Sequence, residues 1–174
     1  MVSKKFKFIS YKTQSLSKKN IQEICLLKID GWKYSFKDQK RWFKKNIFRN
    51  DIHNCLFIED CLVGYTCLRK RKYYFIKKKM DYLLFDTIII KKSFRGLNLG
   101  KKLMRFNNRI IKKNKLPSFL ITTKKNLNFY RNSKWKINFK NFTFTNHKVK
   151  KNKILMNLNI DKILLKQPKI FLST

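Results

Sequence analysis

The middle of the chain contains a short basic segment whose residue types and spacing suit the binding of phosphate groups. It follows a strongly apolar run at 83–90 and contains two glycines, Gly96 and Gly100. Apolar residues then recur at helical spacing from Leu99 to about Lys113. Cations, which add charge for further phosphates, flank the second glycine at Arg95, Lys101, Lys102 and Arg105. A strand, loop and helix in this order can receive a pyrophosphate, because the glycines let the backbone approach and the amides of the helix N-terminus are exposed.

The segment Phe94–Met104 resembles the acetyl-CoA signature of the GNAT family of N-acetyltransferases, which reads Arg/Gln-x-x-Gly-x-Gly/Ala. Arg95 and Gly100 match the two ends of that signature. Asn98 stands where the family usually has its middle glycine. Because asparagine is among the residues that best tolerate left-handed backbone angles, we expect the loop to survive this change.

A second segment, Asn128–Trp135, is similar to the Leu-Tyr-x-x-x-Gly-Phe stretch of the same family. Tyr130 matches the tyrosine that protonates the departing CoA thiolate in many members. Lys134 replaces the glycine of that stretch, and Thr123 stands where the family often has an asparagine. The resemblance covers residues 54–137 well, and the flanking parts of the chain match in the order of their elements.

The resemblance implies an acetyl-CoA-dependent transfer in which a primary amine attacks the thioester directly in a ternary complex. The strand would offer backbone groups to the pantetheine arm, the loop amides would hold the pyrophosphate, and an amide near Ile90 would polarise the thioester. The implied cofactor-binding residues are Ile88, Ile89, Ile90, Arg95, Gly96, Leu97, Asn98, Leu99, Gly100, Lys101 and Lys102. The amine must be neutral to attack, and Asp86, four residues before Ile90, is the candidate base.

Each of these assignments has a structural alternative that the sequence leaves open. Asp86 could be a buried partner of a lysine. Tyr130 could be a core tyrosine whose hydroxyl finds a backbone acceptor. The cations after Gly100 could form a solvated helix face in a lysine-rich protein.

The acceptor side of the expected site is bordered by aromatic residues. Trp32 and Tyr34 lie in the loop between the first two expected helices. Aromatic walls suit a sugar, a nucleobase or a peptide equally, so the acceptor is an amine of a small molecule or a peptide. A polycationic acceptor such as an aminoglycoside usually needs an acidic pocket, and the chain has only nine acidic residues.

Hydrophobic periodicity predicts a single α/β domain over residues 1–174, with the element order β-α-α-β-β-β-α-β-α-β-β. Strands are expected at 6–9, 55–58, 61–68, 83–90, 118–122, 135–145 and 154–160. Helices are expected at 17–31, 36–48, 99–113 and 127–132. By resemblance, the sheet is mixed, mostly antiparallel and flanked by helices. The tail, 161–174, is expected to pack on a neighbour or on its own domain.

The net charge of +35 raises a second hypothesis, a basic nucleic-acid-binding module. The run Arg69–Phe75 sets cations beside aromatics, which suits stacking on single strands. The basic residues are nevertheless spread over the whole chain, which favours a compositional bias of the genome and a non-specific attraction to polyanions. A third hypothesis is a degenerate GNAT domain that binds CoA only, which Asn98 and Lys134 would support.

Other classes of protein fit the composition less well. The four cysteines, Cys25, Cys55, Cys61 and Cys67, show no Cys-x-x-Cys spacing, and only His53 and His147 accompany them. We therefore expect reduced structural cysteines and no metal site. The apolar runs are too short to span a bilayer, and no signal-peptide stretch follows the basic start. A cytoplasmic monomer or homodimer without a membrane partner is the expectation.

Overall fold

The structure is a computed structural model, and it describes residues 5–75, 78–137, 142–144, 153–160 and 170–173. The chain divides into two compact units: the first comprises Met1–Arg69 and Thr87–Asn108, and the second comprises Lys70–Asp86 and Arg109–Thr174. Strands β3 (Cys61–Phe75) and β4 (Lys78–Ile90) contribute residues to both units.

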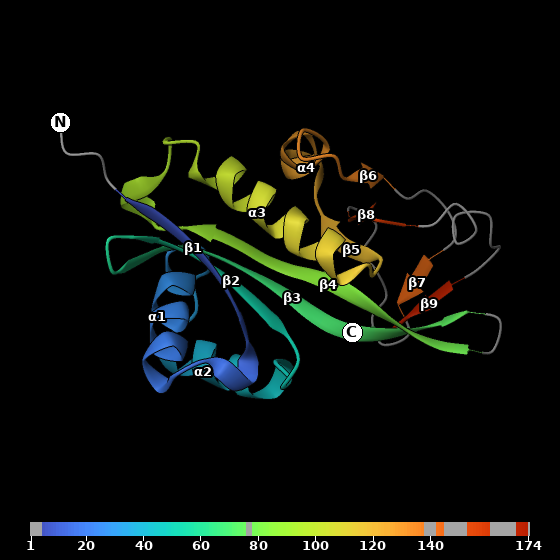
Figure 1. Ribbon diagram of the computed structural model, residues 1–174, viewed down its shortest axis with the longest axis horizontal. Helices are drawn as coiled ribbons and strands as arrows, with labels where there is room; N and C mark the ends of the chain where they lie inside the picture. Colours follow the sequence, from blue (N-terminus) through green and yellow to red (C-terminus); the bar gives the residue numbers. More distant parts are fainter. Residues whose placement is uncertain (1–4, 76–77, 138–141, 145–152, 161–169, 174) are drawn as a thin grey trace. The chain divides into compact units, whose positions relative to one another are not determined.

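Antiparallel strands form the sheet of the first unit, in the order β1, β2, β3 (Figure 1). β1 (Phe6–Lys12) pairs with β2 (Ile52–Ile58) over its full length. β2 and β3 form the hairpin that the two apolar runs predicted. A β-bulge shifts their register between Leu56 and Phe57.

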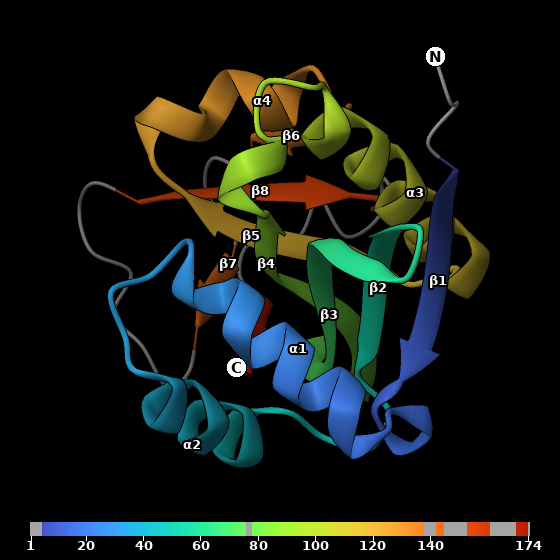
Figure 2. The same ribbon diagram turned by 90° about the vertical axis from the view of Figure 1, so that its left-hand side faces the viewer.

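Two helices of the first unit begin at serine caps. α1 (Lys18–Ile29) follows Ser17, whose hydroxyl accepts a hydrogen bond from the amide of Asn20, and this cap was predicted. α2 (Phe36–Asn46) follows Ser35, which caps it in the same way. A short 3-10 turn, η1 (Thr13–Ser15), leads from β1 into α1. Figure 2 shows α1 and α2 lying side by side against the strands β1 to β3.

The sheet of the first unit is covered on both faces, and β2 shows this most clearly. Its seven residues are all buried, and successive strand residues point to opposite faces. Cys55 and Phe57 belong to a cluster with buried residues of α1 and α2. Leu56 and Ile58 belong to another cluster that includes Leu103 of α3 (Leu99–Asn114). A sheet covered by helices on both faces buries its inner strands completely, and β2 is such a strand.

His53 on β2 lies in the first of these clusters as a fully buried ring. Its Nδ1 is 2.7 Å from the hydroxyl oxygen of Tyr65, and its Nε2 is 2.8 Å from Oγ1 of Thr13. The Thr13 hydroxyl donates to the carbonyl of Asp51, so its oxygen accepts from Nε2–H and Tyr65 donates to Nδ1. Burial lowers the pKa of His53 to about 4. This histidine therefore has a structural role. His147 lies outside the described residues.

We expect His53 to make the stability depend on pH. Between pH 6.5 and about 4, the unfolded chain binds a proton at His53 that the folded protein does not, so the free energy of unfolding falls by roughly 3 kcal/mol as the pH decreases across this window. Urea unfolding of the wild type and of His53→Gln at several pH values isolates this contribution, because the carboxylates titrate in both proteins. The contribution of His53 would be contradicted if the free energy of unfolding depended on pH identically in the two proteins. Should the variant not fold, an NMR titration of the ring in the wild type measures the same pKa.

The second unit continues from β4 in the strand order β4, β5, β8, β6. β5 (Ser118–Thr122) pairs parallel with β4 at Leu83 and Leu84, and antiparallel with β8 (Ile154–Leu158). β6 (Lys136–Ile137) pairs with the other edge of β8. Two short helical turns, η3 (Lys124–Asn126) and α4 (Leu127–Arg131), connect β5 to β6.

The predicted end of the strand expected at 61–68 is wrong, because β3 continues through the basic run after Leu68 to Phe75. Arg69 and Arg71 are buried, whereas Lys70 and Lys72 alternate with them and are exposed. Both lysines pair with Asp81, at 2.9 Å and 2.5 Å between nitrogen and oxygen. The run is therefore a half-buried strand whose exposed lysines share one carboxylate, and not the exposed stacking surface that the nucleic-acid hypothesis requires.

The single strand expected at 135–145 is also wrong. The described residues of this region form two separate strands with different partners, β6 on β8 and β7 (Phe142–Phe144) on β9 (Ile170–Leu172). β9 also pairs with β3, so the described end of the tail packs on its own chain, one of the two outcomes expected for it. The Tyr82 hydroxyl donates to the carbonyl of Ser173 at 2.5 Å.

The fold class is α/β with a mixed, mostly antiparallel sheet flanked by helices, as the sequence predicted. The parallel pairs in the described part of the chain are β4 with β5 and β7 with β9. None of the described helices combines the length and the apolar character that crossing a membrane requires.

Candidate active site

The predicted phosphate-binding loop follows the last residue of β4 in the first unit. A 3-10 turn, η2 (Lys92–Phe94), leads into it, and α3 begins after it at Leu99. Two loop residues have left-handed backbone angles, Gly96 with φ +85° and Asn98 with φ +55°. Asn98 thus adopts the conformation that the family's glycine would adopt, as expected from its tolerance of these angles.

The N-terminus of α3 presents unpaired backbone donors to this loop. The first helical hydrogen bond runs from the amide of Lys102 to the carbonyl of Asn98, at 3.2 Å, and the amides of the first turn before it have no acceptor within the helix. The first turn carries no acidic residue, and Lys101 and Arg105 are exposed beside it. The Nζ of Lys102 lies 4.6 Å from the ring centre of Phe6. A helix N-terminus of this kind, with its positive dipole end and nearby cations, suits an anion.

The loop is hydrogen-bonded to the C-terminus of α1 through Asp30, a residue that the sequence analysis missed. The amide of Lys92 donates to Oδ2 of Asp30, and Nη2 of Arg95 donates to the Asp30 carbonyl, each at 3.0 Å. Nε of Arg95 donates to the carbonyl of Ile90, also at 3.0 Å. The guanidinium of Arg95 therefore holds the loop in place, and the residue can offer a ligand its backbone amide.

The predicted acceptor-side aromatics lie in the loop between α1 and α2, next to β4. Trp32 and Tyr34 are exposed, to 36% and 62% of their surface. Gly31 packs against Ile89, since a Cβ on this glycine would come within 2.7 Å of Cδ1 of Ile89. In the first unit, the structure thus brings the acceptor-side loop, the end of the predicted pantetheine strand and the phosphate loop together.

A buried amide network fixes α3 on the sheet of the first unit. Oδ1 of Asn107 accepts hydrogen bonds from Nδ2 of Asn54 and Oγ1 of Thr66, both at 2.9 Å, and all three side chains are fully buried. Asn54 belongs to β2 and Thr66 to β3. The network therefore sets the rotation of the helix whose N-terminus forms the candidate anion site.

The two predicted catalytic residues belong to the second unit. Tyr130 on α4 is buried, with its ring edge-on to those of Phe85 at 6.1 Å and Phe129 at 5.2 Å between centres. Burial raises the pKa of its phenol to about 12, so the phenol is protonated at neutral pH. Within the described part of the chain, its hydroxyl has no hydrogen-bond partner. Asp86 is half-buried on β4.

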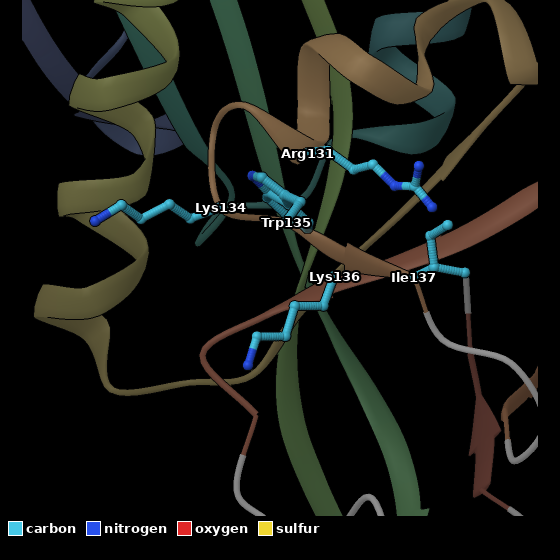
Figure 3. A pocket seen from close by; sticks show the side chains of 5 residues that line it. All are labelled: Arg131, Lys134, Trp135, Lys136 and Ile137. Atoms are coloured by element: carbon cyan, nitrogen blue, oxygen red, sulfur yellow. The ribbon is translucent and has the colours of Figure 1, made fainter.

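The structure also shows a pocket in the second unit, with a volume of about 530 Å³. Its lining residues are Arg131, Lys134, Trp135, Lys136 and Ile137. Figure 3 shows that the side chains of Arg131 and Lys134 extend in opposite directions, so these cations do not converge on one anion. Lys134, which replaces the family's glycine, has a left-handed φ of +67°.

The cysteines and histidines of the described residues form no metal-binding group. Cys25, Cys55 and Cys67 are buried free thiols, as expected for structural cysteines. Cys61 was expected to be buried but is exposed, because it begins β3 at the tip of the hairpin. Its Sγ lies 3.6 Å from Nζ of Lys91.

Comparison with known proteins identifies the fold as that of the GCN5-related N-acetyltransferases, which confirms the sequence resemblance at the level of the fold. An acyl-CoA N-acyltransferase from Pseudomonas aeruginosa is 13% identical and covers 88% of this chain and 99% of its own, with a TM-score of 0.65. The ribosomal-protein-S18-alanine N-acetyltransferase of Escherichia coli is 10% identical; the match covers 87% of this chain and 93% of that protein, with a TM-score of 0.60. Arabidopsis thaliana Naa50, solved with the bisubstrate analogue CoA-Ac-MVNAL, is 14% identical; the match covers 88% of this chain and 99% of that protein, with a TM-score of 0.60. No protein-family model and no curated protein matches the sequence.

Proposed function

We propose that this chain is an acetyl-CoA-dependent N-acetyltransferase, and that residues 1–174 act as one catalytic domain. The observation that carries the proposal is the loop from Arg95 to Gly100, with left-handed angles at Gly96 and Asn98, which opens onto the N-terminus of α3. This loop stands at the end of a strand in a fold whose solved examples include proteins with coenzyme A or a CoA analogue bound.

In this proposal the chain holds acetyl-CoA mainly with backbone groups. The amides from Arg95 to Gly100 donate to the pyrophosphate, and Lys101, Lys102 or Arg105 neutralises the remaining phosphate. Backbone groups of the strand residues 88–90 run along the pantetheine arm. A strand amide near Ile90 polarises the thioester, because its carbonyl oxygen needs a hydrogen-bond donor; the Ile90 carbonyl is an acceptor, and it accepts from Arg95.

The transfer forms a carbon–nitrogen bond and breaks the carbon–sulfur bond of the thioester. A neutral amine attacks the carbonyl, its proton passes to a base, for which Asp86 is the candidate, and the departing sulfur takes up a proton. We assign Tyr130 as the donor to that sulfur. Since its pKa of about 12 exceeds the value of about 8.5 that is usual for a cysteine thiol, Tyr130 stabilises the leaving sulfur first by donating a hydrogen bond.

The acceptor in this proposal is an amine of a small molecule or a peptide that contacts Trp32 and Tyr34. Their exposed rings offer apolar and stacking contacts. The carboxylates nearest to them in the sequence are already engaged: that of Asp30 accepts from the amide of Lys92, and that of Asp38 accepts from the Ser35 hydroxyl and pairs with Arg41. This supports a neutral or anionic acceptor over a polycation.

Thermal unfolding with and without acetyl-CoA, at physiological salt, tests the proposal directly. A ligand at a hundredfold its dissociation constant adds about 2.7 kcal/mol to the free energy of unfolding, so acetyl-CoA is expected to stabilise the protein well beyond ATP, which serves as a polyanion control. Lys101→Glu is expected to weaken the effect of acetyl-CoA, whereas Lys113→Glu, at the other end of α3, is not. Equal thermal shifts with acetyl-CoA and ATP would mean that the stabilisation comes from the negative charge of the ligand alone. Binding without turnover of any amine would identify a degenerate domain.

A further inference from the structure

We propose that Asp30 is a positioning residue that couples the acceptor-side loop, residues 30–35, to the cofactor loop, residues 91–98. Through Asp30, binding of CoA in the cofactor loop would fix the loop that receives the amine. This inference rests on the proposed function, because it assumes that CoA is the ligand of the cofactor loop. It adds a mechanism by which the two substrates of one site influence each other.

Asp30 joins the two loops through two of its own groups. Its side chain accepts from the backbone of Lys92, and its main-chain carbonyl accepts from the side chain of Arg95. Lys92 is the first residue of η2 and Arg95 follows its last residue, so both the beginning and the end of this turn are held to one residue. A shift of the cofactor loop therefore moves Asp30 with it or breaks these bonds.

The position of Asp30 at the end of α1 strengthens this connection. Asp30 is the C-cap of α1, whose last carbonyls carry the negative end of the helix dipole. The guanidinium of Arg95 thus approaches a site that favours a cation, and it spans two carbonyls, those of Asp30 and Ile90. The same arginine therefore connects α1 with the last residue of β4.

The segment after Asp30 transmits a displacement to the aromatic side chains because it is held in a tight turn. The amides of Gly31 and Trp32 both donate to the carbonyl of Lys28, at 3.1 Å, and the amide of Tyr34 donates to the carbonyl of Trp32 at 2.8 Å. Gly31 leaves no room against Ile89. Movement at Asp30 therefore reaches Trp32 and Tyr34. Since coupling between two sites is reciprocal, an acceptor bound there would also strengthen the binding of CoA.

Hydrogen–deuterium exchange with CoA as the probe tests the coupling without a known acceptor. In the wild type, CoA is expected to slow the exchange of the amides at 94–103 by direct contact, and that of the amides at 31–34 by at least about fivefold through Asp30. In Asp30→Ala, the protection at 94–103 is expected to remain and the protection at 31–34 to disappear. Asp60→Ala, which removes an exposed carboxylate of the same unit, is expected to behave as the wild type. Asp30→Asn keeps an acceptor oxygen and is expected to retain most of the protection.

The possible outcomes separate this inference from the proposed function. Absence of protection at 94–103 in the wild type would overturn the proposed function itself. Protection at 94–103 without any effect at 31–34 would overturn the coupling alone. Protection at 31–34 that persists in Asp30→Ala would mean that CoA contacts this loop directly, which also overturns the role of Asp30. Arg95→Met, which removes both guanidinium bonds, repeats the test if Asp30→Ala does not fold.

Discussion

Replacing Tyr130 with phenylalanine is expected to lower kcat by about a hundred- to a thousandfold, within the lower part of the range of a general acid–base contribution. The expected loss arises because phenylalanine cannot donate a hydrogen bond or a proton to the departing sulfur. Binding of acetyl-CoA, measured as a thermal shift, is expected to stay unchanged. Since burial raises the pKa of Tyr130 to about 12, the phenol stays protonated in the usual assay range, and the wild-type rate is expected to show no loss of this acid up to about pH 10.

The contacts of Tyr130 allow its proposed catalytic role to be tested apart from a structural one. The Tyr130 hydroxyl has no hydrogen-bond partner among the described residues, so Tyr130→Phe removes no hydrogen bond to any of them and keeps the ring contacts with Phe85 and Phe129. We therefore expect the free energy of unfolding to change by less than about 0.5 kcal/mol. Tyr74→Phe, at an exposed tyrosine of β3, is the matched control and should leave kcat unchanged. Full activity in Tyr130→Phe would restrict Tyr130 to packing.

The features that the sequence predicted well are those encoded by neighbouring residues. The serine cap of α1 and the apolar spacing of α3 are local signals, and both helices lie where they were expected. The conformation of the loop at 95–98 belongs to the same kind, since the backbone angles of Gly96 and Asn98 depend on residue type. The resemblance to GNAT enzymes rested on this local segment, which explains why it led to the correct fold.

The features that the sequence did not predict depend on residues far apart in the chain. The bonds of Asp30 to Lys92 and Arg95 span 62 and 65 residues, and nothing near Asp30 marks it as different from any exposed acid. The length of β3 was missed for the same reason, because its exposed lysines pair with Asp81 on the next strand. A run of four basic residues does not indicate a strand until such a partner is known.

A substitution at Asn107 is expected to lower the stability strongly. Asn107→Ala would leave the buried donors of Asn54 and Thr66 without their acceptor. An unsatisfied buried polar group costs about 1–3 kcal/mol, so we expect the free energy of unfolding to fall by about 2–4 kcal/mol. This is the lower part of the cost of two unsatisfied groups. It applies because the network is imperfect already: Oδ1 of Asn54 and Nδ2 of Asn107 are buried without a partner among the described residues. Urea unfolding measures the change.

A double-mutant cycle attributes this loss to the hydrogen bonds and not to the missing volume. Thr66→Val removes one donor at nearly constant shape and is expected to destabilise the wild type, but to be close to neutral in the Asn107→Ala background, where the donor is already unpaired. Asn114→Ala, at the exposed end of the same helix, is the control and should change stability by less than about 0.5 kcal/mol. Additive effects of Thr66→Val and Asn107→Ala would contradict the network. Because the network sets the rotation of α3, folded Asn107→Ala is also expected to bind acetyl-CoA more weakly than its Asn114→Ala control.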